Sequence, residues 1–224
     1  MKNLFAFFLV VSFATFAQNG QAQVSIRGGI NYASMSANAT EKTYKDYKNM
    51  SIVGYQLGLA LPIKITQNVA LQPELMWIQK GGKSQTVIND NNQLVSTLTT
   101  NYVEVPLSLK IGLGNNDGTG LGFYVLGGPY VGIALNSKYK NDLTVLGVTT
   151  SSTKTVDYSN NSNPEKRVDW GANLGVGVSF GNVYLDGRYN LGINNLLDNT
   201  ASNSNTNAPY RRNRGLGLTL GVHF

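Results

Sequence analysis

The stretch SIVGYQLGLALPIKI, residues 51–65, decides the fold because every second residue of it is apolar or aromatic. The apolar positions are Val53, Tyr55, Leu57, Leu59, Leu61 and Ile63. The alternate positions are Gly54, Gln56, Gly58, Ala60, Pro62 and Lys64. Alternation with a period of two is typical of a β-strand whose two faces see different surroundings. The stretch therefore predicts a long strand with one apolar face and one small or polar face.

The same alternation recurs along the chain and predicts eight strands, most of about 10 to 15 residues. Soluble strands usually contain about 5 or 6 residues, whereas strands tilted across a bilayer need about 9 to 11. The strand lengths therefore favour a membrane. The other predicted strands are 24–35, 69–80, 101–113, 121–135, 168–180, 183–192 and 215–224.

The connections between these strands alternate between short and long. Short turns are expected at 66–68, 115–118 and 181–182. Long polar loops are expected at 36–50, 81–100, 136–167 and 193–211. Outer-membrane barrels combine short periplasmic turns with long extracellular loops. The sequence thus predicts an all-β fold, an eight-stranded antiparallel up-and-down transmembrane β-barrel with both termini on the short-turn side.

The polar face is expected to line the interior of the barrel. An eight-stranded barrel has a narrow interior filled by side chains, and many of the residues on this face are glycine. Buried charges must be paired, so the mixed charges predict a lumenal polar network that plugs the barrel, with a narrow pore for small solutes as the alternative. Its expected members are Arg27, Glu74, Glu104, Lys110, Asp169, Asp186 and Arg188.

Aromatic residues on the apolar face fall near the strand ends, as in the interfacial girdles of membrane proteins. Those expected at the long-loop ends are Tyr32, Tyr55, Trp77, Trp170 and Tyr189. Those expected at the short-turn ends are Phe123, Phe180 and Phe224. A β-sandwich core, or a soluble periplasmic barrel that binds an apolar ligand, is the alternative interpretation of the apolar face.

Residues 1–22 have the composition of a secretory signal peptide. Lys2 supplies the positive n-region, and 4–17 is apolar but too short to span a membrane as a helix. Small residues at Gly20 and Ala22 suit cleavage after Ala22. We expect Sec-type export, then a barrel domain at 23–224 in the outer membrane.

The composition argues against enzymatic and metal chemistry. The chain has no Cys and a single His, His223, one residue from its end. Transition-metal sites need such ligands, and a base for hydrolysis of outer-leaflet lipid would have to lie at the opposite end of the barrel. We expect no catalytic residue, no metal and no cofactor.

The net charge of +6 is concentrated in the expected loops. Basic residues cluster at 138–140, 154, 166–167 and 211–214. A solvated loop is one interpretation, and a positive rim that faces lipopolysaccharide phosphates is the other. We expect no nucleic-acid binding, because the sequence lacks a groove-reading or stacking motif.

Several segments resemble the PorT-like outer-membrane β-barrel family over nearly the whole mature chain. They are YVEVPL at 102–107, GGPYVG at 127–132, DWGANLGVG at 169–177 and the terminal Phe224. The resemblance implies an eight-stranded barrel in a Gram-negative outer membrane, with Phe224 as the signal read by the barrel-assembly machinery. The founding member is implicated in protein secretion by the type IX system. The expected function is a non-enzymatic barrel that acts through its loops, or as a subunit of an envelope or secretion assembly.

Overall fold

The computed structural model describes residues 23–37, 46–89, 91–113, 120–158, 166–197 and 210–224. Its first strands are β1 (Ser25–Ala37), β2 (Asp46–Met50), β3 (Ile52–Ala60), β4 (Ile63–Lys64), β5 (Val69–Asn89) and β6 (Asn92–Leu113). They are followed by β7 (Leu121–Val145), β8 (Val148–Asp157), β9 (Val168–Phe180), β10 (Val183–Gly192) and β11 (Arg211–His223). No helix in these ranges is long and apolar enough to cross a membrane.

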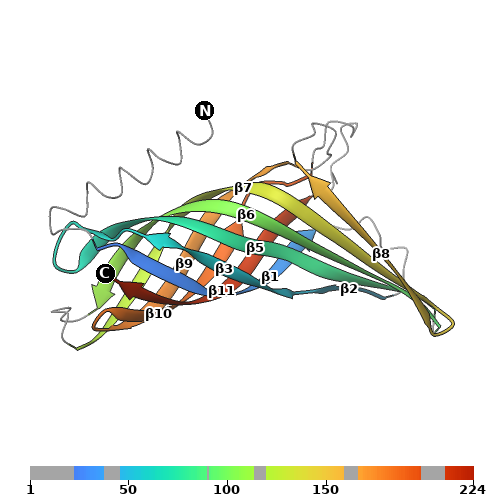
Figure 1. The fold of residues 1–224 in the computed structure, drawn as a ribbon, viewed down its shortest axis with the longest axis horizontal. Helices are drawn as coiled ribbons and strands as arrows, with labels where there is room; N and C mark the ends of the chain where they lie inside the picture. Colours follow the sequence, from blue (N-terminus) through green and yellow to red (C-terminus); the bar gives the residue numbers. More distant parts are fainter. Residues whose placement is uncertain (1–22, 38–45, 90, 114–119, 159–165, 198–209) are drawn as a thin grey trace.

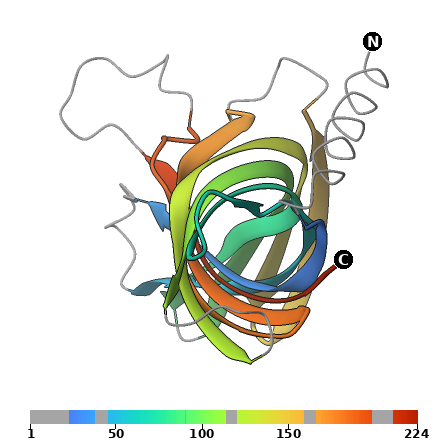
Figure 2. The ribbon, with the colours of Figure 1, turned by 90° about the vertical axis from the view of Figure 1, so that its left-hand side faces the viewer.

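Within the described ranges, eight strands close into a ring. The order around it is β1, β3, β5, β6, β7, β9, β10 and β11, and β11 pairs again with β1. All of these pairings are antiparallel, and the end-on view shows the closed outline (Figure 2). Closure leaves no unpaired sheet edge in the ring, which a bilayer requires. The predicted eight-stranded antiparallel barrel is confirmed.

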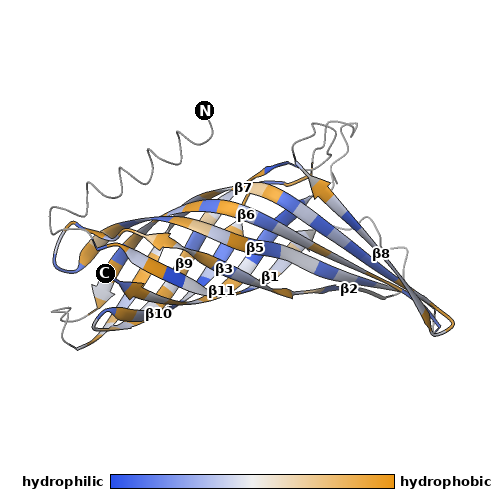
Figure 3. Ribbon diagram, viewed as in Figure 1, coloured by the Kyte–Doolittle hydropathy of each residue, from blue (hydrophilic) through white to orange (hydrophobic). Residues whose placement is uncertain are grey.

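The two faces of each strand are separated as the alternation predicts. In β3 the odd-numbered Val53, Tyr55 and Leu57 are exposed, whereas Gly54 and Gln56 are buried. Figure 3 shows apolar residues recurring along the ring strands and fewer of them on the part that projects to the right. The apolar face therefore points outward and the polar face points into the lumen.

The lumen holds apolar layers as well as polar ones. Tyr124, Leu126 and Tyr184 form one buried cluster. Ile78, Tyr102, Ala134 and Tyr158 form a second. The sequence led us to expect mostly glycine and charge inside, because alternation distinguishes the faces of a strand but not the depth of each residue in the barrel.

Glycines inside the ring make room for two of these tyrosines. Tyr184 pairs with Gly221 on β11, and a Cβ atom at Gly221 would lie 2.2 Å from Cζ of that ring. Tyr124 pairs with Gly177 on β9, where a Cβ atom would meet Cζ at the same distance. Each tyrosine thus covers the glycine on the neighbouring strand, so packing requires glycine at these two positions.

Gly221→Ala should lower the free energy of unfolding by about 1–3 kcal/mol, the usual effect of overpacking. The added methyl would displace Tyr184, whose hydroxyl lies 3.2 Å from Ser25 Oγ. Urea unfolding from lipid vesicles would measure it. Gly187→Ala is the matched control, because no atom lies within 4 Å of a Cβ atom there. Equal stability of the two variants would contradict the packing argument.

Three strands continue far beyond the ring. β5, β6 and β7 contain 21, 22 and 25 residues. Their distal halves, joined by β2 on β5 and β8 on β7, form a sheet that we call the projecting sheet (Figure 1). Beyond the last pair of β7 with β9, Ile133 with Val168, β7 runs on to Val145. Ten residues of strand span roughly 33 Å, so this sheet reaches well outside a bilayer.

The expectation of long loops at 81–100 and 136–167 is therefore wrong for most of their length. Both segments are largely β-hairpin, and the 36–50 segment contains β2. The physical reason is that both faces of these hairpins contact water, so their sequence carries no apolar alternation, although its threonines and valines favour strands. Most of the fourth expected loop, and the turn expected at 115–118, lie outside the described residues.

Candidate functional site

Four charged side chains form the centre of the lumen, and we call them the central cluster: Arg27, Glu74, Asp186 and Arg188. Arg27 on β1 contacts both carboxylates, Glu74 Oε2 at 2.9 Å and Asp186 Oδ1 at 2.9 Å. Arg188 on β10 lies 2.7 Å from Glu74 Oε1 and 3.0 Å from Asp186 Oδ1. Each carboxylate therefore lies between two guanidinium groups.

Neutral donors complete this cluster. The Gln72 side-chain amide donates to Glu74 Oε1 at 2.6 Å, and the Tyr124 hydroxyl donates to Asp186 Oδ2 at 3.4 Å. The four charged residues are buried and their formal charges cancel. Two positive and two negative groups in direct contact satisfy the requirement that buried charge be paired, although Arg27 Nε has no hydrogen-bond partner among the described residues. The cluster thus links β1, β5 and β10 across the lumen.

A second group, the upper cluster, lies closer to the projecting sheet and consists of Lys80, Glu104 and Asp169. Lys80 on β5 contacts Glu104 on β6 and lies 3.0 Å from Asp169 Oδ2 on β9. Its ammonium also lies 4.1 Å from the centre of the Tyr130 ring. Asn213 on β11 donates to Asp169 Oδ2 at 3.0 Å. These contacts join β5, β6, β9 and β11 at a second level.

The structure brings together six of the seven residues expected in the lumenal network, in two groups. They are Arg27, Glu74, Asp186 and Arg188 in the central cluster, with Glu104 and Asp169 in the upper cluster. Lys110 joins neither group through an ion pair within the described residues, and its ammonium lies over the Tyr124 ring at 3.8 Å. The sequence reasoning missed Lys80, although its even number places it on the same face as Gln72 and Glu74.

The aromatic residues expected in the girdles are all exposed on the outer surface of the described ring. They are Tyr32, Tyr55, Trp77, Phe123, Trp170, Phe180, Tyr189 and Phe224. Phe224, the expected assembly signal, follows β11, and its backbone N–H donates to the Val24 carbonyl at 2.8 Å. This bond fixes the chain end beside β1. The predicted signal peptide, 1–22, lies outside the described residues.

The surface of β7 and β8 in the projecting sheet is mostly exposed, and most of its charged residues are lysines. Lys138, Lys140 and Lys154 are exposed on β7 and β8. Asp142 accepts a hydrogen bond from Ser151 at 2.6 Å and pairs with Lys140 at 2.9 Å. These two neighbours, Ser151 foremost, hold the pKa of Asp142 below its usual value. In the described residues β8 pairs with β7 alone, so its other edge lies open.

The tip of the β7–β8 hairpin is apolar. It contains Leu146 and Gly147, whose φ angles of 51° and 82° suit a tight two-residue turn. The flanking residues, Val145 and Val148, are exposed, as is Leu146. The Leu146 N–H donates to the Asn91 carbonyl at 3.0 Å, so the two long hairpins contact each other at their ends.

The lone histidine lies at the opposite end of the barrel, as its position in the sequence implies. His223 is half-buried and its ring centre lies 4.7 Å from that of Tyr184. No group of three or more acidic or histidine side chains suited to a metal ion occurs among the described residues. Among the described residues, the charged side chains of the central and upper clusters form ion pairs in the lumen, whereas Lys110 does not.

Comparison with known proteins gives a family match. A model of the family described as "Outer membrane protein beta-barrel domain" matches residues 16–198. None of the curated proteins matches the chain.

Three bacterial proteins are among the similar solved structures. OprG from Pseudomonas aeruginosa has a TM-score of 0.48 at 11% identity, over 91% of this chain and 96% of its own. Neisserial surface protein A has a TM-score of 0.37 at 14% identity, over 91% of this chain and 99% of its own. Ail, the attachment invasion locus protein of Yersinia pestis, has a TM-score of 0.37 at 12% identity, over 90% of this chain and 99% of its own.

Proposed function

Because the chain belongs to the outer membrane protein beta-barrel domain family, we propose that it is a non-enzymatic barrel that holds the projecting sheet at the cell surface. The ring provides the membrane anchor, and the sheet provides the surface that binds another component of the envelope. The observation that carries this proposal is the continuation of β5, β6 and β7 about ten residues beyond the ring as ordered sheet.

The open edge of β8 supports binding through the sheet. An unpaired strand edge presents a row of N–H and C=O groups to which an extended segment of another protein can add. β8 pairs with β7 through ten successive residues, and its sequence contains neither proline nor glycine, which would interrupt such an edge. The resemblance to PorT-like proteins supports an envelope or secretion assembly as the source of the partner.

Exposed basic residues near the long-loop end support contact with lipopolysaccharide as well. Lys138, Lys166 and Arg212 are exposed there, and anionic phosphates would be attracted to them. Folding of the barrel would depend on the barrel-assembly machinery, for which the terminal Phe224 is the proposed signal.

The proposal predicts that the purified barrel is electrically silent in a planar bilayer. The central and upper clusters fill the lumen at two levels with buried, paired side chains. The protein should therefore show no steady single-channel steps in salt solution. A large-pored porin reconstituted in the same bilayer is the positive control. Reproducible conductance steps would favour the alternative function, a narrow pore for small solutes.

A second prediction concerns the open edge of β8. A photoreactive amino acid at Thr153 should form a discrete crosslinked product in intact cells, because this residue lies on the proposed contact strand. The same amino acid at Thr66, in the exposed turn between β4 and β5, is the control and should not give that product. Absence of a product specific to Thr153 would contradict the proposed role of this edge.

A further inference from the structure

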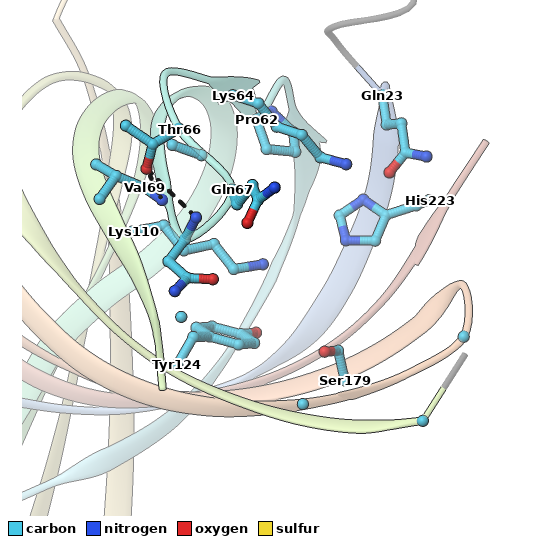
Figure 4. Close-up of a pocket in the computed structure, with 16 residues that line it drawn as sticks. Gln23, Pro62, Lys64, Thr66, Gln67, Val69, Lys110, Tyr124, Ser179 and His223 are labelled. Atoms are coloured by element: carbon cyan, nitrogen blue, oxygen red, sulfur yellow. Dashed lines mark hydrogen bonds between the residues drawn. The ribbon is translucent and has the colours of Figure 1, made fainter. Parts of the chain in front are cut away.

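The short-turn end of the barrel contains a pocket that the proposed function does not use. Its volume is about 150 Å³, and it lies between the β4–β5 turn, the ends of β6 and β7, and the final residues of β11 (Figure 4). We call it the mouth pocket and define it by Lys64, Lys110 and His223. Among the described residues that line it, there is no carboxylate. The charged residues in the described part of its lining are therefore all basic.

Lys110 differs from the other charged residues of the lumen. Arg27, Lys80 and Arg188 all contact carboxylates directly. Lys110 forms no ion pair within the described residues, and its ammonium lies 3.8 Å from the Tyr124 ring centre and 5.7 Å from that of Tyr184. Contact with an aromatic face holds a cation in place without neutralising it. Lys110 thus brings a positioned positive charge to the pocket.

Two further groups face the same hollow. Figure 4 shows Lys64 and His223 lining the pocket with Lys110, while Gln67 extends into it from the β4–β5 turn. Lys64 is exposed, and it too forms no ion pair within the described part of the chain. His223 Nδ1 is shielded from solvent and has no hydrogen-bond partner among the residues that the structure describes. A shielded polar atom of this kind is unusual and gains by acquiring a partner.

The turn that carries part of this lining is held in shape. Thr66 Oγ1 accepts hydrogen bonds from the backbone N–H groups of Asn68, at 3.3 Å, and Val69, at 3.1 Å. The side-chain amides of Gln23, Gln67 and Asn68 and the Ser179 hydroxyl add neutral donors around the hollow. The pocket therefore combines two ammonium groups, one imidazole and several hydrogen-bond donors in a preformed cavity.

We propose that the mouth pocket binds a tetrahedral oxyanion of the phosphate type, free or as the terminal group of a soluble molecule. Lysine binds phosphate as a compact point charge with three donors, and the neutral donors around the hollow can contact the remaining oxygens of a tetrahedral ion. A volume of about 150 Å³ holds such an ion together with water. The site is reached from the periplasmic side, where family barrels place their short turns.

The test uses the full mature protein, without a histidine tag, in an uncharged maltoside detergent. Because the chain has one histidine, the ring signals of His223 in NMR spectra report on the pocket alone. Titration with inorganic phosphate at constant ionic strength should shift these signals to saturation. Sulfate, of the same geometry, should also saturate, whereas chloride should not. Glycerol phosphate would show whether a monoester is accepted as well as the free ion.

Lys110→Gln and Lys64→Gln should each weaken phosphate binding about tenfold or more, because each removes a charged hydrogen bond. Lys154→Gln, on the projecting sheet at the other end, is the matched control and should bind as the parent does. Lys64 is exposed, so its variant answers the question even if Lys110→Gln fails to fold. A linear, chloride-like response of the parent, equal affinity in Lys64→Gln, or acetate binding as tightly as phosphate would overturn the proposal.

Discussion

Glu74→Gln should lower the free energy of unfolding by about 3–5 kcal/mol, the usual consequence of removing one partner from a buried ion pair. Glu74 contacts Arg27 at 2.9 Å and Arg188 at 2.7 Å, and all three side chains are buried. The amide retains the shape of the carboxylate but leaves two guanidinium groups with one remaining carboxylate, Asp186. Urea unfolding from lipid vesicles would measure the loss.

Two further variants separate charge imbalance from a general effect of the substitution. The double change Glu74→Gln with Arg188→Met restores one cation to one anion, since Arg27 still contacts Asp186 at 2.9 Å. It should lose less stability than the sum of the two single changes, as expected for residues that interact. Asp142→Asn breaks an exposed pair with Lys140 and should leave stability unchanged within error. A loss in Glu74→Gln no larger than in Asp142→Asn would refute the cluster's structural role.

Leu57→Arg should destabilise the barrel in lipid by up to about 2–4 kcal/mol, because an arginine on the lipid face costs most at the midplane and less toward the interfaces. Leu57 lies in the middle of β3 with 57% of its surface exposed, and it pairs with Gly28 on β1 and Trp77 on β5. Reversible unfolding from vesicles of defined thickness is the measurement.

Leu146→Arg is the matched control for that experiment. Leu146 is also an exposed leucine, with 76% of its surface accessible, but it lies at the tip of the projecting sheet. The same substitution there should change stability little, because water already surrounds the site. If both variants lost the same stability, the apolar face of β3 could not be the face that meets lipid.

The candidate site shows where sequence reasoning reaches its limit. The alternation in β5 and β10 placed Glu74, Asp186 and Arg188 inside the barrel, because side chains two residues apart share a face. It could not decide that Lys80, rather than Lys110, would contact Glu104 and Asp169. Which lysine contacts these carboxylates depends on how the strands are staggered around the ring. The periodicity of a single strand does not reveal that stagger.

The projecting sheet shows a second limit. Residues 81–100 read as a polar loop, yet those of them that the structure describes belong to the β5–β6 hairpin, whose register there runs from Gly81 with Thr99 to Asn89 with Asn92. Hydrophobic alternation marks a strand only when its faces differ in environment. Where water contacts both faces, backbone hydrogen bonds between neighbouring strands hold the strand in place. Hydrophobic alternation then does not predict the strand.

By itself the sequence determined the eight-stranded ring, its antiparallel order and the face that each residue presents. These features follow from the alternation of side chains along a strand, because one face of each strand meets lipid and the other faces the lumen. Only the tertiary structure decided which charges meet in the lumen, how far β5, β6 and β7 continue beyond the ring, and that Lys64, Lys110 and His223 share one pocket. Those outcomes depend on closure of the ring, which joins residues far apart in the chain at a depth set by strand stagger.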